Sequence, residues 1–199
     1  MFDGIGETLA GDNKQLNADD ESELVDRCKA ELPYITVSYE ILLRRYQTTV
    51  YRFCLGYLRH GQDAEEVTQD VFLRVFHHIR GFEKRSSFKT WLMQIAKNQC
   101  ARRYGQIKKR NELNEKLREE HDQDNPGAEV VPETSDGLAM QTLHALGTDA
   151  REILSLRHLS GLSLNEVAKI LDLSASAAKM RHHRAVKQFR EIYEKKRKL

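Results

Sequence analysis

The chain has 199 residues, a formal net charge of +2, 40% hydrophobic residues and three cysteines. Its length suits one large or two small domains, and no apolar run approaches the roughly 18 residues that a membrane span requires. The N-terminus lacks the apolar segment of a signal peptide, so we expect a cytoplasmic protein without membrane insertion.

The small net charge conceals two basic blocks. Residues 81–110 hold nine lysines and arginines against one acid, Glu83, and residues 179–199 hold nine against Glu191 and Glu194. Charge sorted this sharply predicts two separate contacts with a polyanion. Two solvated helix faces are the alternative, but they would not require such sorting.

The cysteines indicate neither a disulfide framework nor a metal centre. Cys28, Cys54 and Cys100 are odd in number and unclustered in the sequence, which favours buried free thiols in a reducing compartment. The adjacent pairs His77-His78 and His182-His183 cannot chelate one ion, because neighbours on a helix point about 100° apart. We therefore predict no metal site, no cofactor and no catalytic set.

In chain order, residues 1–19 are polar and glycine-rich without periodicity and are predicted to form a disordered arm. Asp20 caps a short helix ending near Ala30. A long helix with an apolar stripe then spans about 38–58, and Gly61 is expected to end it. The motif from Asp63 to Glu66 is expected to start the next helix, which reaches about residue 80.

A third helix starts near Phe88 and closes the first domain near Tyr104, giving domain bounds of 20–110. Residues 111–137 are acidic, contain two prolines and are predicted to form a flexible linker. A 33-residue coil from Gly105 to Gly137 would span roughly 30 Å at rest and about 110 Å when extended.

The second domain, 138–199, shows the pattern of a helix-turn-helix. Asp149 is expected to cap one helix, Ser163 and Glu166 form a capping box for a second, and Ser174 caps a long basic helix after a tight turn at Asp172. A plain three-helix bundle is the alternative. The predicted fold is all-α: two small helical domains joined by an acidic flexible linker.

The last helix is predicted to read duplex DNA. Its inward register runs through Ala178, His182, Ala185 and Phe189, which leaves the opposite stripe for base edges in the major groove. The residues predicted to contact this DNA, as base readers or phosphate partners, are Ser174, Ser176, Lys179, Met180, Arg181, His183, Arg184 and Lys187.

The first basic block is predicted to hold a single strand, because cations suit phosphates and aromatic rings suit unstacked bases. Phe82, Phe88, Trp91 and Tyr104 supply the rings, although Trp91 by its register belongs to the core. A core helix with a solvated charged face is the alternative. The predicted strand contacts are Lys84, Arg85, Ser86, Ser87, Lys89, Lys97, Asn98, Arg102 and Arg103.

Four motifs, in this order and spacing, resemble the extracytoplasmic-function (group IV) sigma factors of bacterial RNA polymerase. They are DAEEVTQDVFL (63–73), FKTWL with IAKN (88–98), AREILSLR (150–157) and KMRHHRA (179–185). The N-terminal segments RCKAEL (27–32) and RRY (44–46) are also similar to the sigma factor X type of pseudomonads.

The resemblance implies a dissociable factor that binds core RNA polymerase and directs initiation at specific promoters, in a stress or envelope response. It implies sigma region 2 at 20–110, which docks on polymerase through Asp63, Glu66, Gln69 and Asp70 and melts the −10 element. It implies sigma region 4 at 138–199, which reads the −35 element, and it makes an anti-sigma factor a possible partner.

Two other functional classes account for parts of this sequence. A helix-turn-helix regulator with a sensory domain would act without polymerase, but it would not need a basic turn or an exposed acidic and amidic helix face. An enzyme acting on nucleic acid would need a catalytic set that the sequence does not offer. We therefore expect a protein that is not an enzyme.

Overall fold

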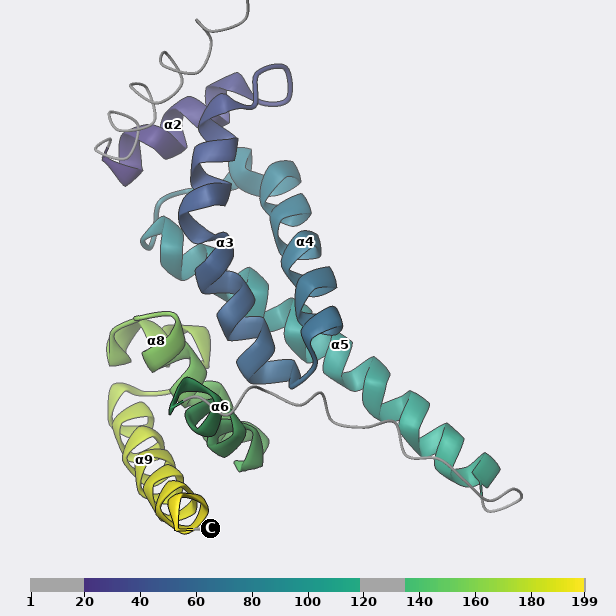
Figure 1. Cartoon of the computed structure of the whole chain (residues 1–199). Coiled ribbons are helices and arrows are strands. Elements are labelled where there is room, and N and C mark those ends of the chain that lie inside the picture. Colours follow the sequence, from purple (N-terminus) through teal and green to yellow (C-terminus); the bar gives the residue numbers. More distant parts are fainter. Residues whose placement is uncertain (1–19, 119–134, 199) are drawn as a thin grey trace, which may run out of the picture.

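The computed structural model describes residues 20–118 and 135–198, and within these ranges the chain forms helices and short connections without any strand. The predicted N-terminal arm and most of the predicted linker lie outside the described residues. Figure 1 shows the helices arranged in two groups, which correspond to the two predicted domains.

The first group is a bundle of three long helices crossed by a short one. It contains α2 (Glu21–Glu31), α3 (Val37–Leu58), α4 (Gly61–His78), the 3₁₀ turn η1 (Ile79–Gly81) and α5 (Phe88–Arg118). The stripes predicted from periodicity are buried: Val50 and Phe53 on α3 and Val67, Val71 and Val75 on α4 face a common core.

The junction between α3 and α4 differs from the prediction that Gly61 ends one helix and Asp63 caps the next. Arg59 adopts the left-handed conformation, with φ of 68°, and its N–H donates to Leu55 O. His60 is the N-cap, and its ring nitrogen accepts from the Asp63 backbone N–H at 3.3 Å. Because Arg59 makes the turn, Gly61 becomes the first residue of α4.

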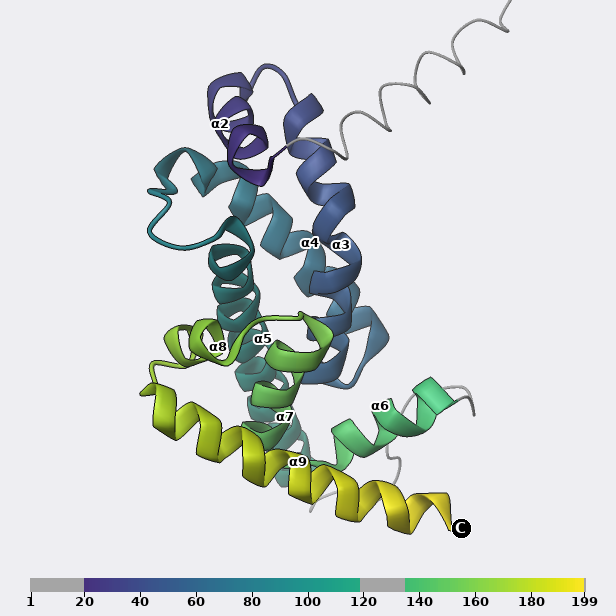
Figure 2. The same ribbon diagram turned by 90° about the vertical axis from the view of Figure 1, so that its left-hand side faces the viewer.

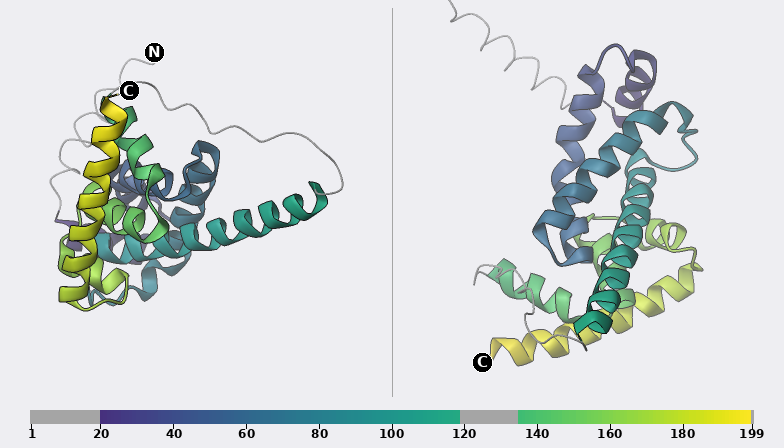
Figure 3. Two further views of the ribbon diagram at one scale, coloured as in Figure 1. Left: turned by 90° about the horizontal axis from the view of Figure 1, so that it is seen from below. Right: turned by 90° about the vertical axis from the view of Figure 1, so that its right-hand side faces the viewer.

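Helix α5 is longer than predicted. It continues through Gly105 to Arg118, so the coil expected from Gly105 is helical over its first part. Lys, Arg, Gln, Glu and Leu dominate this continuation, and all are strong helix formers. Figure 3 shows that the end of α5 projects beyond the rest of the protein.

The second group comprises α6 (Ser135–Ala145), α7 (Thr148–Leu154) with the π turn η2 (Ser155–Leu159), α8 (Leu164–Ile170) and α9 (Ala175–Arg197). The capping box of Ser163 and Glu166 and the cap by Ser174 are confirmed. The predicted cap by Asp149 is wrong, because Gly147 is the N-cap and Asp149 falls inside the first turn.

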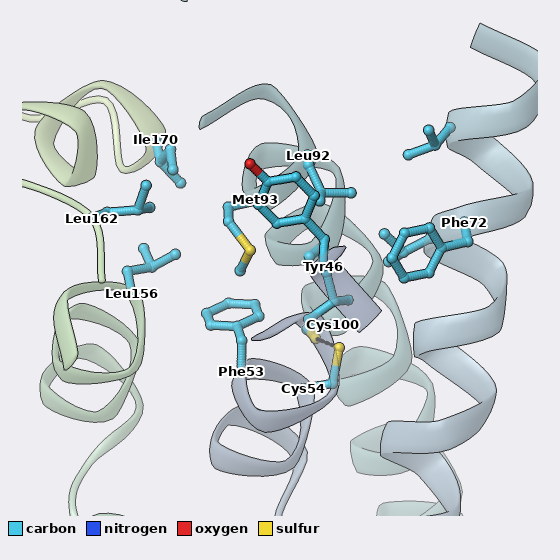
Figure 4. Packing of buried hydrophobic residues seen from close by; sticks show 14 of the residues in the cluster. Tyr46, Phe53, Cys54, Phe72, Leu92, Met93, Cys100, Leu156, Leu162 and Ile170 are labelled. Carbon is cyan, nitrogen blue, oxygen red and sulfur yellow. Dashed lines mark hydrogen bonds between the residues drawn. The ribbon is translucent and has the colours of Figure 1, made fainter. Parts of the chain in front are cut away.

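The two groups pack on each other, which the sequence did not predict. Helix α3 contacts α7 and η2, and α5 contacts α8, so α8 lies beside α5 in Figure 2. In Figure 4, Leu156 and Leu162 of the second group face Phe53 and Met93 of the first, and all of them are buried in one cluster.

We call the contact between the two groups of helices the seam. Gly56 on α3 allows α3 and η2 to approach each other closely there. A Cβ at this position would lie 2.7 Å from Leu159 Cδ1 and 3.0 Å from Ser155 Oγ, closer than side chains tolerate. Two polar contacts flank it. Arg59 Nη2 donates to Leu146 O at 3.2 Å, and His144 Nε2 lies 3.1 Å from Leu55 O.

Candidate nucleic-acid and protein interfaces

The four residues predicted on the outer face of α4 divide into two pairs. The side chains of Gln69 and Asp70 are exposed and make no hydrogen bond or ion pair within residues 20–118 and 135–198. Asp63 and Glu66 contact Arg103 of α5, at 2.5 Å and 2.6 Å from its Nη2. Of these four residues, only Gln69 and Asp70, in the third turn of α4, are therefore free to bind a partner without breaking an internal contact.

Arg103 was predicted to contact a single strand, but its guanidinium is directed along α5 to the start of α4. Its hydrogen bonds to the two carboxylates raise the pKa of the Arg103 guanidinium, with Asp63 as the largest cause. The neighbouring Arg102 is exposed and has no described partner.

The turn before α5 presents its basic residues in different ways. Lys84, with φ of 57°, donates to Asp26 Oδ2 at 2.6 Å and to Ser22 Oγ at 2.8 Å, so it fastens the turn to α2. Arg85 keeps 87% of its side chain exposed and pairs locally with Glu83. Ser87 ends the turn by accepting from the Thr90 backbone N–H at 3.1 Å.

The aromatic rings around this turn pack against one another and against neighbouring helices, and they do not form an exposed surface on which bases could stack. Phe82 and Phe88 are buried, and the Phe82–Trp91 and Phe88–Trp91 ring centroids lie 5.0 Å and 5.8 Å apart. Tyr104 packs edge-on against Tyr57. The prediction that these rings stack on bases is wrong for Phe82 and Phe88, because both are buried in the core. The core position expected for Trp91 is supported.

The remaining predicted strand residues lie in the turn before α5 and along α5. Asn98 and Arg102 are exposed, Ser86, Lys89 and Lys97 are partly buried, and Ser87 is exposed. With Arg85 they give the turn and α5 a polar and basic surface, in which Lys89 and Asn98 lie on opposite faces of the helix.

Helix α9 presents the stripe predicted for duplex DNA. Ser176, Lys179, Met180, His183, Arg184 and Lys187 are all exposed, with Met180 at 53%. Ser174 caps the helix by accepting from the Ala177 backbone N–H at 3.1 Å. The inward register holds at Ala178 and Ala185, which are buried.

Arg181 departs from this stripe. Its guanidinium turns inward and contacts Asp149 O at 2.8 Å and Glu152 Oε2 at 3.1 Å. Burial raises the pKa of Glu152, against the opposing effect of Arg181. Arg181 therefore holds α9 on α7 in this structure and is not presented to solvent as Lys179 is.

The structure also shows three contacts that sequence reasoning missed. The thiols of Cys54 and Cys100 are free but meet in the core at 3.5 Å, although the sequence separates them. His158 and His182 stack, with their Nε2 atoms 3.0 Å apart. Glu166 reaches across the seam to Ser87 and Thr90. Each joins elements that are distant in the chain, so no local pattern signals it.

Within the described ranges, no group of three or more His, Cys, Asp and Glu side chains is placed to hold a metal ion. Among the same residues, no helix is both long and apolar enough to cross a membrane.

In comparison with known proteins, each of the two groups of helices matches a region of the same protein family, sigma-70. Residues 42–110 match the family model "Sigma-70 region 2", and residues 142–191 match "Sigma-70, region 4". The chain is similar to the "ECF RNA polymerase sigma factor SigC" of Mycobacterium tuberculosis, with 32% identity covering 73% of this chain and 78% of the relative. It is also similar to the "ECF RNA polymerase sigma-E factor" of Haemophilus influenzae, with 29% identity over 80% and 87% of the two chains.

Two solved structures share the arrangement of helices. One is CnrH in complex with the cytosolic domain of CnrY, with a TM-score of 0.65, 21% identity and coverage of 88% of this chain and 98% of that one. The other is the sigma factor RpoE in complex with the anti-sigma factor NepR from Bartonella quintana, with a TM-score of 0.63, 23% identity and coverage of 78% and 96%.

Proposed function

The chain belongs to the ECF family of RNA polymerase sigma factors, and from that premise we propose how its surfaces divide the work of promoter recognition. A sigma factor of this family binds core RNA polymerase and directs transcription initiation at specific promoters. One observation carries the assignment: the matched regions 2 and 4 coincide with the two groups of helices and occur in the expected order.

The outer face of α4 is the proposed contact with polymerase. Asp63, Glu66, Gln69 and Asp70 lie on this helix, and the exposed side chains of Gln69 and Asp70 have no described internal partner. An exposed acidic and amidic face without such partners has hydrogen-bonding capacity to offer another protein. We expect Gln69 and Asp70 to contribute most, since Asp63 and Glu66 are already paired with Arg103.

The polar and basic surface along the turn and α5 is the proposed contact with the melted −10 strand. Basic side chains along a helix can follow a strand's phosphates. Because Phe82 and Phe88 are buried, base capture falls to the exposed polar residues of the turn. The proposed contacts are Lys84, Arg85, Ser86, Ser87, Lys89, Lys97, Asn98, Arg102 and Arg103.

Helix α9 is the proposed reader of the −35 element in duplex form. Its exposed stripe begins at the N-terminal half of the second helix of the helix-turn-helix, where such helices contact base edges. Met180 offers only apolar contact, while Lys179 and His183 can donate hydrogen bonds. Ser174, Ser176, Arg184 and Lys187 complete the surface, and Arg181 joins it only after releasing Glu152.

An anti-sigma protein is a proposed partner, and the seam between the two groups offers it a place. A groove of about 770 Å³ lies there, lined by apolar side chains of α3, α6, η2 and α9, among them Leu55, Met140 and Phe189. Arg52 and Arg190 also line it and have no partner in the described part of the chain. An amphipathic helix with acidic residues at its edges fits this combination.

We further propose that the protein acts in the cytoplasm, where core polymerase works, and that it carries no catalysis of its own. The stress or envelope response and the relation to the sigma factor X type remain predictions from the sequence.

Run-off transcription on genomic fragments, with and without core polymerase, tests the proposed function. We expect specific transcripts only when both proteins are present, and weak binding of promoter duplex by the isolated protein. Strong sequence-specific footprints by the isolated protein, with no gain from core enzyme, would instead favour a helix-turn-helix regulator.

A further inference from the structure

The Glu166 carboxylate of α8 joins the two groups of helices. Its Oε2 accepts from the backbone N–H and the hydroxyl of Ser163, at 2.8 Å and 2.7 Å, and so completes the cap of its own helix. Its Oε1 accepts from Thr90 Oγ1 at 2.8 Å and from Ser87 Oγ at 3.3 Å in the other domain. One carboxylate thus accepts hydrogen bonds both at the start of α8 and at the start of α5.

The charge of this carboxylate is stabilised where it lies. Burial favours its neutral form, but the hydrogen bonds from Ser163, Thr90 and Ser87 outweigh this and lower the pKa of Glu166 to about 2. The hydroxyls at the start of α5 therefore hold a full negative charge. A backbone phosphate of a nucleic acid strand has the same charge and accepts the same hydrogen bonds.

The second domain also approaches other parts of the proposed strand surface. Lys97 acts electrostatically on Glu152 of α7, which lies across the seam. The Lys89 ammonium lies beside Gly161, since a Cβ there would be 3.4 Å from Nζ. Acidic or backbone groups of the second domain thus neighbour Ser87, Lys89 and Lys97, three of the proposed −10 contacts.

We propose that region 4 masks the −10 surface in the free protein, with the Glu166 carboxylate occupying a phosphate site formed by the hydroxyls of Ser87 and Thr90. This rests on the proposed role of the turn and α5 in strand binding. It adds Thr90 to the proposed strand contacts, whose list did not include it. DNA and region 4 then compete for the same hydroxyls, and strand binding requires the seam to open.

Two variants of the full-length protein open the seam by independent means. Glu166→Gln removes the charge while keeping the size and one acceptor of the side chain. Gly56→Leu inserts a side chain where Leu159 and Ser155 leave no room, and it lies on α3, away from the hydroxyls. The matched controls are Glu191→Gln, at an exposed acid of α9, and Gly105→Leu, where nothing lies within 4 Å of a Cβ.

The probe is a fluorescein-labelled, random-sequence single-stranded oligodeoxynucleotide, titrated by anisotropy, with small-angle scattering of each variant in parallel. We expect Glu166→Gln and Gly56→Leu to increase the radius of gyration and to tighten strand binding about fivefold or more, as coupled equilibria of this kind do. The controls should match the wild type. Adding Thr90→Val to Glu166→Gln should then weaken strand binding again. Circular dichroism establishes that each variant is folded.

Several outcomes would overturn the proposal. Variants that open without tighter strand binding would show that region 4 does not mask the surface. If Glu166→Gln stays closed and binds as the wild type does, the carboxylate does not hold the mask, even where Gly56→Leu opens. An unchanged affinity on adding Thr90→Val would remove Thr90 from the site.

The proposed −10 surface has a separate test. Lys97→Ala combined with Asn98→Ala should reduce run-off transcription with core enzyme. If transcription is unaffected, the assignment of the surface fails. If transcription falls as expected but no variant binds the strand more tightly, the surface stands and only the masking by region 4 is rejected.

Discussion

The Nε atom of Arg103 on α5 lies 2.7 Å from Oδ1 of Asp63 on α4, and the same guanidinium reaches Glu66 at 2.6 Å. An arginine of the proposed strand surface is thereby neutralised by two acids of the proposed polymerase face, and the three side chains together keep one negative charge. The two surfaces are therefore adjacent and meet at this ion pair.

We expect Arg103→Ala to lower the free energy of unfolding by about 1 kcal/mol, because it leaves two carboxylates without their partner at a partly exposed site. Thermal unfolding should shift down by a few degrees. Arg102→Ala is the matched control, since Arg102 is exposed and unpaired in the described structure, and its melting temperature should equal that of the wild type. Equal melting temperatures for all three proteins would refute a structural role for Arg103.

The double variant Gln69→Ala, Asp70→Ala should weaken binding of core polymerase by about tenfold or more without changing the melting temperature, because both side chains are exposed and have no described internal contacts. Competition for core enzyme against a labelled wild-type protein measures this. Gln47→Ala with Glu112→Ala, at exposed positions on α3 and α5, is the control pair. Unchanged competition by the first pair would show that polymerase docks elsewhere.

Met180→Ala and Lys187→Ala should affect the −35 element differently. Loss of the apolar contact at Met180 should reduce transcription most at promoters with a thymine in reach, since only thymine offers a methyl group in the major groove. Loss of Lys187 should weaken all promoters alike and reduce the salt dependence of binding by about one unit of slope. Holoenzyme binding at several salt concentrations distinguishes them, and the same effect from both variants would contradict the assignment.

The stacked pair His158 and His182 predicts a loss of stability on mild acidification. Burial lowers the pKa of both rings, and for His182 the neighbouring His158, Arg157 and His183 lower it further. A ring whose pKa is lower in the folded state stabilises the fold above its ordinary pKa of about 6.5, and this stability is lost as pH falls through the lowered pKa. The melting temperature should therefore fall between pH 7.5 and pH 5.5.

His182→Leu tests this pair, because it keeps an apolar side chain between α9 and η2 while removing one titrating ring. We expect its melting temperature to change less over the same pH interval than that of the wild type. His77→Leu, at an exposed position on α4, controls for removal of a histidine as such. A wild-type profile retained in His182→Leu would show that the pair is not the source.

Local patterns predicted most of the helices, because their signals lie within a few residues. The stripe of Val67, Val71 and Val75 and the cap of Ser163 with Glu166 are of this kind. Helix ends were less predictable where an unexpected residue made the turn, as Arg59 did before Gly61. Its φ lies in a region that β-carbon-bearing residues seldom occupy, so sequence favours glycine there.

Helical periodicity predicted most of the exposed side chains on α4 and α9, but it gave no sign of the internal partners that some of the candidate residues have. Nothing near Glu166 in the chain indicates Ser87 and Thr90, and nothing near Arg181 distinguishes it from the exposed Arg184. Basic composition likewise identified the turn before α5 but not the burial of Phe82 and Phe88. Such contacts depend on how the two groups of helices pack, which periodicity does not encode.

The continuation of α5 bears on promoter architecture. A helix rises 1.5 Å per residue, so residues 105–118 cover only about 20 Å, where a coil of that length could stretch to more than twice as far. The segment up to Ser135 adds at most about 60 Å by any path, which reduces the greatest reach from about 110 Å to about 80 Å. Promoter elements two helical turns apart are separated by roughly 70 Å. The greatest reach of the segment between the two domains thus exceeds the separation of the promoter elements by only a small margin. The distance between the two promoter elements should therefore tolerate few inserted base pairs.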